Sequence, residues 1–273
     1  MIDRNRLAVC SWSLQPESCA DLIEKVRATG LTRVQLHLNP IATGEAGWVD
    51  AASDLAAADI AVVSGMLTCV GEDYSSIAAI ERTGGIVPDA TWRETRAQAA
   101  AAVPIARDLG LRLVTLHAGF IPHEPANPLR KTVMHRLAEV ADLYAAIGCA
   151  IALETGQESA AALLSLLDEL GRNDVGVNFD PANMLLYGSG DPIAALQQLA
   201  PRVRQAHLKD AVASHQPGIE WGQEVPVGEG QVDWPAFFTA LQTAGFDGDC
   251  CVEREAGDQR IEDVRTAAEF VTR

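Results

Sequence analysis

Short runs of apolar residues alternate along this chain with longer stretches in which apolar residues recur at helical spacing. The short runs are rich in Val, Ile, Leu and Cys, which is typical of parallel strands covered on both faces. We expect strands at 6–12, 33–38, 60–67, 112–118, 149–154, 175–180, 203–209 and 248–253. We expect helices at 19–29, 46–58, 89–109, 128–147, 159–171, 191–200, 233–244 and 259–272. Strand and helix therefore alternate regularly.

This alternation predicts the α/β class and a single (β/α)8 TIM barrel. Eight strands and eight helices suit the usual size of that fold. An open doubly wound sheet is the alternative, but it usually has a glycine-rich turn after its first strand, and the sequence Cys10-Ser-Trp-Ser-Leu contains none. No linker-like or low-complexity segment interrupts the chain. We therefore expect one domain over residues 1–273.

Composition and charge narrow the class of partner. The formal net charge of −16 argues against a nucleic-acid partner, which usually requires a basic surface. No apolar stretch is long enough for a signal peptide or a membrane span, so we expect no membrane partner and a cytoplasmic location. The six cysteines form no C-x-x-C pair and are expected to be free thiols, as in a reducing compartment.

Four chemically active residues stand at the ends of four consecutive predicted strands. Glu154, Asp180, His207 and Glu253 each close an apolar run. If these ends point into the barrel, three carboxylates and one imidazole converge and can bind one divalent ion. Such a ligand set favours Mn²⁺, with Mg²⁺, Co²⁺ or Zn²⁺ as alternatives. The competing interpretation is a set of helix caps and surface charges, with Asp180 acting as a turn residue before Pro181.

Several motifs resemble the sugar-phosphate isomerase/epimerase family, which has the xylose-isomerase-like TIM barrel. They are "ALETG", "GVNFDPANMLLYGSGDP", "AHLKDA", "VPVGEGQVDWPAFFTAL" and "GDCCVEREAG". In relatives such as D-tagatose 3-epimerase, residues at the matching positions bind the metal, which implies that role for Glu154, Asp180, His207 and Glu253. The resemblance also implies that Glu154 and Glu253 move protons beside a substrate carbonyl while the metal stabilises an enediolate. Relatives often form homodimers, so we expect that state here.

The chain also departs from the epimerase pattern. Asn183 stands where the epimerase has a histidine, and the sequence His207-Leu-Lys209-Asp210 lacks the arginine that follows the metal histidine. The H-x-K-D form is more similar to inosose dehydratase. Lys209 is therefore a catalytic candidate that could stabilise an oxyanion, bind a phosphate or protonate a leaving hydroxide. Its alternative role is a salt bridge to Asp210 or to another carboxylate at the rim.

Weaker signals suggest further substrate contacts. His37 and His117 end predicted strands and either face the substrate or simply form hydrogen bonds at the strand ends. Trp12 and Trp221 could pack against a sugar, Trp12 being equally compatible with the core. Glu158 either contacts the substrate or occupies the first turn of the next helix. Sequence alone also leaves Glu255 as an alternative to Glu253 as the ligand from the eighth strand.

The leading functional expectation is a metal-dependent isomerase or epimerase of a sugar or a related polyol that carries a carbonyl. The first alternative is a lyase that dehydrates or β-eliminates a keto-inositol or a 3-keto sugar. An abasic-site endonuclease would need further metal ligands and a basic groove, which the negative charge disfavours. A catalytically inactive binding protein is disfavoured by the intact set of four ligands.

Overall fold

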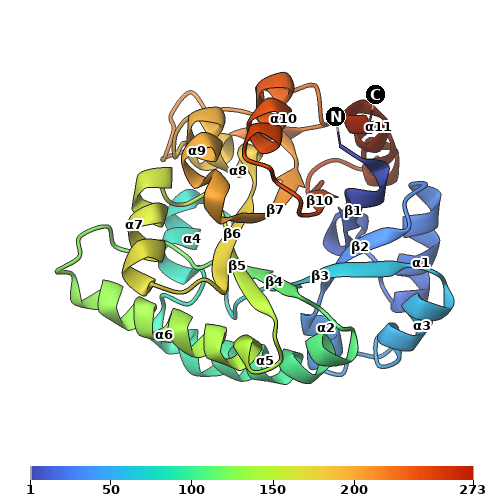
Figure 1. Cartoon of the computed structure of the whole chain (residues 1–273), viewed down its shortest axis with the longest axis horizontal. Helices are drawn as coiled ribbons and strands as arrows, with labels where there is room; N and C mark the ends of the chain where they lie inside the picture. Colours follow the sequence, from blue (N-terminus) through green and yellow to red (C-terminus); the bar gives the residue numbers. More distant parts are fainter. Residues whose placement is uncertain (1, 273) are drawn as a thin grey trace.

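A closed barrel of eight parallel strands lies at the centre of the computed structural model, which describes residues 2–272 (Figure 1). Its strands are β1 (Leu7–Cys10), β2 (Arg33–His37), β3 (Ala61–Leu67), β4 (Leu113–Leu116), β5 (Ala150–Glu154), β6 (Val175–Phe179), β7 (Val203–Leu208) and β10 (Cys250–Val252). The barrel closes because β1 pairs with both β2 and β10, in parallel. The predicted TIM-barrel fold is confirmed.

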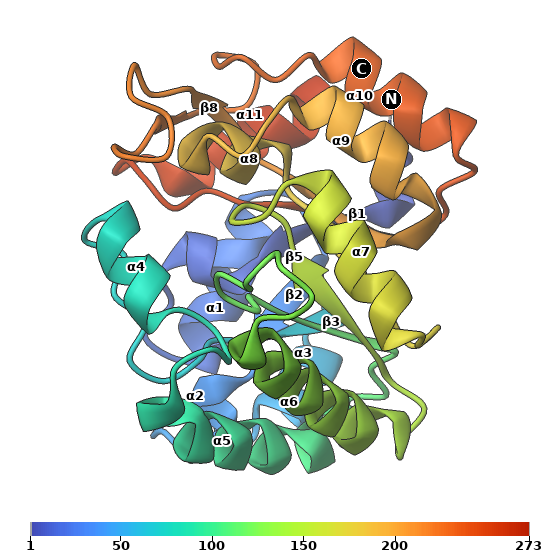
Figure 2. The ribbon, with the colours of Figure 1, turned by 90° about the vertical axis from the view of Figure 1, so that its left-hand side faces the viewer.

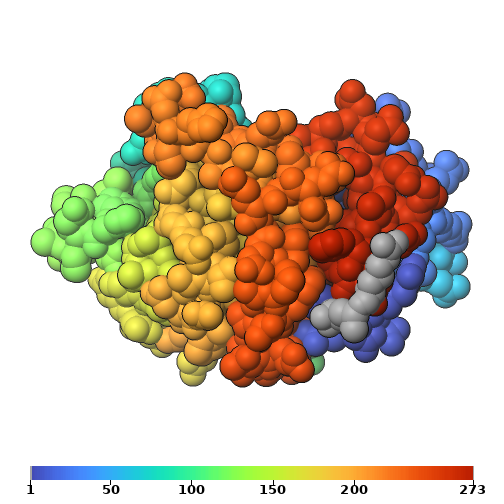
Figure 3. All heavy atoms as spheres, turned by 90° about the horizontal axis from the view of Figure 1, so that it is seen from above, coloured from blue at the N-terminus to red at the C-terminus, as the bar shows by residue number. Residues whose placement is uncertain are grey.

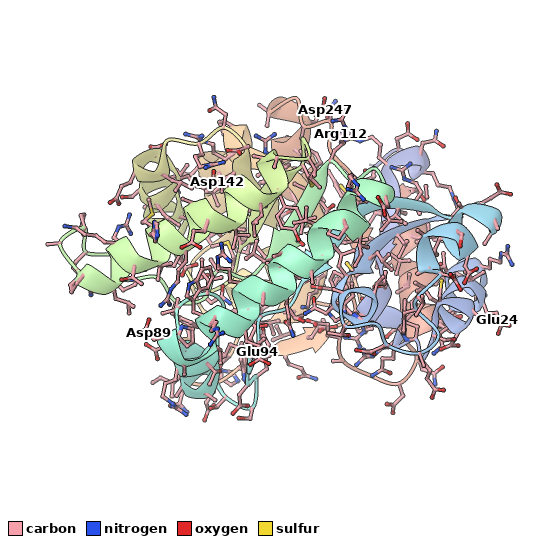
Figure 4. All side chains as sticks on the ribbon, turned by 90° about the horizontal axis from the view of Figure 1, so that it is seen from below. Glu24, Asp89, Glu94, Arg112, Asp142 and Asp247 are labelled. Atoms are coloured by element: carbon pink, nitrogen blue, oxygen red, sulfur yellow. The ribbon has the colours of Figure 1, made fainter. Side chains whose placement is uncertain are left out.

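Helices surround the barrel. They are α1 (Cys19–Ala28), α2 (Asn39–Ala42), α3 (Ala51–Ala57), α4 (Ile77–Thr83), α5 (Asp89–Asp108), α6 (Pro128–Ala145), α7 (Ala160–Leu170), α8 (Pro181–Tyr187), α9 (Pro192–Leu199), α10 (Trp234–Thr243) and α11 (Arg260–Thr272). The two longest, α5 and α6, lie side by side, with exposed acids such as Glu94 and Asp142 on their outer surfaces (Figure 4). The segments from α9 to α11 occupy much of the face shown in Figure 3.

The ends of the helices follow local chemistry. Ser18 caps α1, Asn127 caps α6 and Asp191 caps α9, each accepting a hydrogen bond from a backbone N–H in the first turn. Gly171 ends α7 with a φ of 64°, a left-handed conformation that glycine adopts without steric cost. The helices then bury their apolar faces against strands whose residues are buried on both sides.

Several short elements were absent from the sequence-based prediction. Helices α2, α4 and α8, and the antiparallel hairpin of β8 (Asp210–Val212) and β9 (Gln223–Val225), all lie in connections that follow barrel strands. Each spans seven residues or fewer, which is too short to display a clear hydrophobic period. The strand expected at 6–12 ends at Cys10, and Trp12 lies in a 3-10 turn, Ser11–Leu14. The helix expected from residue 46 begins only at Ala51.

The connections that follow the strands gather at one end of the barrel. In Figure 2, α4, α8 and the β8–β9 hairpin project from the same side of the molecule. This is the end at which the carboxyl ends of the parallel strands open, and TIM barrels place their functional residues there.

The structure also bears on the state of the cysteines and on whether a helix could span a membrane. All six cysteines are buried free thiols, as predicted. Among residues 2–272, no helix is both long and apolar enough to cross a lipid bilayer.

Asp210 organises the connection between β7 and α10. Its Oδ2 atom accepts hydrogen bonds from the backbone of Gly228 and Gly230 and from Nε1 of Trp234, and its Oδ1 atom accepts from Val232. A Cβ atom on Gly230 would lie only 2.1 Å from Oδ1 of Asp210, so only glycine fits at that position. The turn at Gly228-Glu-Gly230 is thus built around a buried carboxylate.

Candidate metal centre

The four residues predicted to bind a metal converge at the carboxyl ends of four neighbouring strands. Glu154 ends β5, Asp180 directly follows β6, His207 lies in β7 and Glu253 directly follows β10. One ligand atom from each lies within 4.8 Å of all the others, and all four residues are buried. Nδ1 of His207 is 3.3 Å from Oε1 of Glu154 and from Oε2 of Glu253, and 3.6 Å from Oδ2 of Asp180.

The donor atoms in this group fit a cation. Asp180 uses Oδ1 to cap α8 by accepting a hydrogen bond from the N–H of Asn183, at 2.9 Å. Its Oδ2 atom and Nδ1 of His207 are buried and have no hydrogen-bond partner among the described residues. Buried polar atoms without a partner are uncommon, and a missing ion is one explanation for them. The helix cap and the ligand role of Asp180 are therefore compatible, because they use different oxygens.

Gln35 directs Nδ1 of His207 toward the carboxylates. Nε2 of His207 lies 2.8 Å from Oε1 of Gln35, and the Gln35 amide is oriented by donating to Oγ1 of Thr115. The amide nitrogen of Asn178 also approaches Nε2, at 3.0 Å, but it donates to Oε2 of Glu154. We therefore assign the imidazole proton to Nε2, which leaves Nδ1 as the lone-pair donor for a metal.

The charges in the group strongly perturb one another. Burial alone would lower the pKa of His207, but Glu154 and Glu253 outweigh it and hold that pKa well above its usual value. Burial raises the pKa of Asp180 to about 6. Burial would also raise the pKa of Glu253, but Lys209 and His207 hold it well below the ordinary value. Crowded carboxylates therefore depend on nearby positive charge, which a metal ion supplies efficiently.

Lys209 lies beside this group and is only 2% exposed. Its Nζ atom is 2.9 Å from Oε2 of Glu253, 2.5 Å from Oε2 of Glu255 and 3.3 Å from Oδ1 of Asn183. The salt bridge considered from sequence is therefore present, with Glu253 and Glu255 as its partners. Asp210 binds the following turn instead. Glu255 contacts Lys209, and Glu253 is the carboxylate that joins the ligand group.

A cavity of about 610 Å³ opens beside the group. Seven of the residues predicted to contact substrate or catalyse line it: Trp12, His37, His117, Asn183, Lys209, Trp221 and Glu253. Asn183 donates to Oε1 of Glu154, and Trp12 donates through Nε1 to Oε1 of Glu253 at 2.7 Å. Nε2 of His117 is 3.7 Å from Oε2 of Glu154. These side chains therefore connect the cavity directly to the candidate ligands.

Glu158, for which the sequence allowed either a substrate contact or a place in the first turn of the next helix, does not line this cavity and lies one residue before the cap of α7. Its Oε1 atom accepts a hydrogen bond from the backbone of Ile121 at 3.0 Å, and only 8% of the residue is exposed. Burial raises the pKa of Glu158 to about 7. The residue directly precedes Ser159, the cap of α7, so its position is explained by the loop that it fastens rather than by substrate contact.

Sequence reasoning did not identify several residues that shape the site. Tyr74, Tyr187 and Glu224 line the cavity, and Gln35 orients His207. Tyr74 and Glu224 lie in long connections with no periodic signal, while Tyr187 ends the short helix α8. The inward position of Gln35 could have been read from strand alternation, because it lies two residues before His37 in β2.

The geometry defines a class of protein: a TIM barrel with a carboxylate–histidine group suited to a divalent ion at the carboxyl ends of its strands. Comparison with known families makes this specific. Residues 11–273 match the family described as xylose isomerase-like TIM barrel, and the chain belongs to that family. The family suggested by the sequence motifs is thereby confirmed.

Individual similar proteins include a xylose isomerase domain protein from Planctomyces limnophilus. Its crystal structure superimposes on this chain with a TM-score of 0.84. The alignment covers 92% of this chain and 90% of that protein, with 34% sequence identity. The IOLI protein with a bound zinc atom is 17% identical, with a TM-score of 0.74 over 98% of this chain and 96% of its own. At that identity the likeness shows the fold alone.

Among curated proteins, the chain is similar to an inosose dehydratase from Lacticaseibacillus casei. The match is 27% identical over 112 residues and covers 37% of each protein. The matched stretches span about half the length, or less, of the curated relatives. More distant structural neighbours, at 14% to 17% identity, include an L-ribulose 3-epimerase, the probable 3-DHS dehydratase AsbF from Bacillus anthracis and a Mycobacterium smegmatis barrel in complex with magnesium.

Proposed function

We propose that this protein is a divalent-metal-dependent isomerase or epimerase of a sugar or a related polyol that carries a carbonyl. The observation that carries the proposal is the buried group of Glu154, Asp180, His207 and Glu253 beside a cavity. Within it, Oδ2 of Asp180 and Nδ1 of His207 have no hydrogen-bond partner among the described residues. The names of similar proteins support it, because they include an epimerase and structures with zinc or magnesium.

The four residues of the group would hold the ion. A bound divalent ion acts as a Lewis acid that polarises a carbonyl and so acidifies the neighbouring C–H bond. Glu154 and Glu253 approach from different strands and supply the proton transfer. One carboxylate removes the proton from the carbon beside the carbonyl. A carboxyl group on the opposite face then returns a proton to that carbon, which inverts it. Return to the former carbonyl carbon, together with transfer of the neighbouring hydroxyl proton to the former carbonyl oxygen, gives isomerisation instead.

The test combines metal analysis with hydrogen exchange. The purified protein should contain about one divalent ion per chain, with Mn²⁺ our preferred ion. Incubation in D₂O with ketoses and keto-inositols should place deuterium on the carbon beside the carbonyl, measured by NMR after the metal is chelated. Glu154→Gln should lower that rate by at least about 100-fold. Glu94→Gln, on the exposed surface of α5, is the matched control and should not change it (Figure 4). Full exchange by Glu154→Gln after exhaustive chelation would refute the mechanism.

A lyase is the second candidate, favoured by the similarity to inosose dehydratase. It would begin with the same proton abstraction and then expel a hydroxyl group from the next carbon as water. An unsaturated ketone absorbs in the ultraviolet, so a rise in absorbance together with loss of water by mass spectrometry would identify this outcome. Deuterium exchange without any change in mass beyond that of deuterium would favour the epimerase.

Other expectations from sequence remain proposals. We propose that residues 1–273 form one domain, that the protein acts in the cytoplasm on a small carbohydrate, and that it forms a homodimer, which light scattering can test. We expect no nucleic-acid partner and place an abasic-site endonuclease last, because Glu224 and Glu255 make the cavity rim acidic.

A further inference from the structure

Among residues 2–272, Lys209 is the only lysine or arginine that lines the cavity beside the candidate metal centre. An ammonium group has three N–H donors. Those of Lys209 are matched by Oδ1 of Asn183, Oε2 of Glu253 and Oε2 of Glu255, at 3.3, 2.9 and 2.5 Å. Two of the acceptors are carboxylates, so both the donors and the charge of Lys209 are already engaged. An incoming phosphate or carboxylate would have to displace one of these partners.

No other nearby base offers a free positive charge. Nε2 of His37 is 3.1 Å from Oγ1 of Thr68, and burial lowers the pKa of His37, which leaves it neutral at pH 7. His117 has the Gln157 amide at Nδ1 and the Glu154 carboxylate at Nε2. The guanidinium of Arg254 is outside the lining and is bound by Glu224 and Asp263.

The acidic residues, in contrast, are numerous. Glu224, Glu253 and Glu255 line the cavity, and Glu154 and Asp180 lie beside it. Together these five carboxylates exceed the combined charge of one divalent ion and Lys209, so the site stays negative when the ion is bound. An anionic ligand would therefore meet net repulsion without a compensating ion pair.

The remaining wall is suited to an uncharged ligand with an apolar face. Trp12, Met66, Tyr74, Leu186, Tyr187 and Trp221 line the cavity. The rings of Tyr187 and Trp221 pack edge to face, with centroids 4.6 Å apart. Nε1 of Trp221 is shielded from solvent and has no hydrogen-bond partner among the described residues, so the contribution of Trp221 to the wall is its ring. Aromatic faces with a few polar groups are typical of sites that bind neutral polar rings.

We propose that this site takes an uncharged sugar or polyol, whose apolar face packs against Trp221 and Tyr187, and discriminates against phosphorylated and carboxylated analogues. The inference rests on the proposed function and names its substrate class. It can fail while the metal-dependent chemistry stands.

The first test compares matched ligands for binding as well as turnover. Protein loaded with Mg²⁺ is titrated by tryptophan fluorescence with D-fructose and D-fructose 6-phosphate, and with scyllo-inosose and an inositol phosphate. We expect each neutral ligand to bind at least about tenfold more tightly than its anionic counterpart. Equal or tighter binding of the anion overturns the inference, whatever the turnover. Neutral binding without any deuterium exchange supports the substrate class and contradicts the proposed chemistry.

The second test changes the charge at the rim. Glu255→Gln removes one negative charge beside Lys209 and leaves more of the lysine's positive charge uncompensated, so it should reduce the preference for the neutral ligand by about fivefold, an effect that diminishes with added salt. Glu229→Gln removes an equally negative but exposed side chain outside the lining and should leave the preference unchanged. An unchanged preference in Glu255→Gln, or an equal change in Glu229→Gln, would contradict the electrostatic argument.

The third test concerns the aromatic wall. Trp221→Ala should weaken binding of the neutral ligand by about tenfold because it removes the aromatic surface against which the ligand packs. Trp221→Phe keeps a ring and should recover part of that loss. Unchanged neutral binding in Trp221→Ala would overturn the assignment of this wall to the substrate.

Discussion

Gln35 illustrates how a single uncharged side chain governs the candidate metal centre. Its Oε1 atom accepts the N–H at Nε2 of His207, which makes Nδ1 the coordinating nitrogen. Replacing Gln35 by Leu removes that acceptor, and loss of such an orienting partner typically lowers metal affinity 10- to 100-fold.

We therefore predict that Gln35→Leu weakens binding of Zn²⁺ by about 10-fold or more, measured by calorimetry. Gln35→Glu retains an acceptor at the same place and should recover most of the affinity. NMR of the ring nitrogens in the metal-loaded protein should show Nε2 protonated in the wild type. Unaltered affinity in Gln35→Leu would show that His207 does not depend on this bond.

Glu158 gives a prediction about pH and stability. Its folded pKa of about 7 is above the ordinary carboxyl value because the side chain is buried, so the folded protein holds this proton more tightly than the unfolded chain does. The contribution of Glu158 to the free energy of unfolding is therefore largest below the ordinary carboxyl pKa. It is lost as the pH rises from there through 7. Glu158→Gln is neutral at every pH and still accepts from Ile121.

The free energy of unfolding of Glu158→Gln should thus exceed that of the wild type at pH 8, by up to about 3 kcal/mol, with the difference shrinking toward pH 5. Urea titrations at the two pH values measure it. Glu94→Gln, exposed on α5, should show no such trend. A difference that grows toward acid pH would reverse the sign of the argument.

At the scale of elements, the β8–β9 hairpin depends on Asp210, its first residue. Asp210 starts β8 and binds the backbone of the turn that precedes α10, while Trp221 lies between β8 and β9. The hairpin thus contributes Trp221 to the cavity wall, while Asp210, which does not line the cavity, fastens the hairpin to the turn before α10.

We predict that Asp210→Asn destabilises the protein by about 2–3 kcal/mol, because an amide cannot accept all of these hydrogen bonds and its NH₂ group would face backbone donors. Hydrogen exchange should accelerate in residues 211–231 before it does so elsewhere. Asp247→Asn, at an exposed position marked in Figure 4, should change stability by less than about 0.5 kcal/mol. Uniform destabilisation without local exchange would contradict a local role.

The elements that sequence predicted well are those long enough to display a period. The twenty residues of α5 and the eighteen of α6 are bounded close to their predicted limits. Helix α8 has seven residues, all of them part of a motif that reads as a loop because Asp180-Pro181 begins it and Gly188 ends it. Its buried residues lie on more than one side of the helix, so the sequence shows no hydrophobic repeat of helical period.

At the scale of the whole molecule, the candidate ligands join strands β5, β6, β7 and β10 of one closed barrel. An ion held by all four strands binds the folded chain and has no comparable site in the unfolded one, so it should raise the melting temperature. At a concentration 100 times its dissociation constant, an ion contributes about 2.7 kcal/mol.

We predict that adding Mn²⁺ or Zn²⁺ to chelator-treated protein raises the melting temperature by about 5 °C or more. In Glu154→Gln the shift should be much smaller, and in Glu94→Gln it should equal that of the wild type. Scanning calorimetry measures all three. An equal shift in Glu154→Gln would place the ion elsewhere on the protein.

The sequence by itself determined the barrel and the four side chains that meet in it. Parallel strands that are buried on both faces need apolar runs, and strand alternation together with one βα unit between successive ends brings Glu154, Asp180 and His207 to one rim. These are local and periodic properties, so they can be read along the chain.

Only the tertiary structure decided how those side chains are engaged. Lys209 is saturated by residues from two other segments, and Gln35 reaches His207 from another strand. Glu158 accepts a hydrogen bond from the backbone of Ile121 and does not line the cavity. Such contacts join residues far apart in the chain, and no spacing or period records which atom meets which. The charge balance of the cavity, and with it the class of substrate we propose, follows from those contacts.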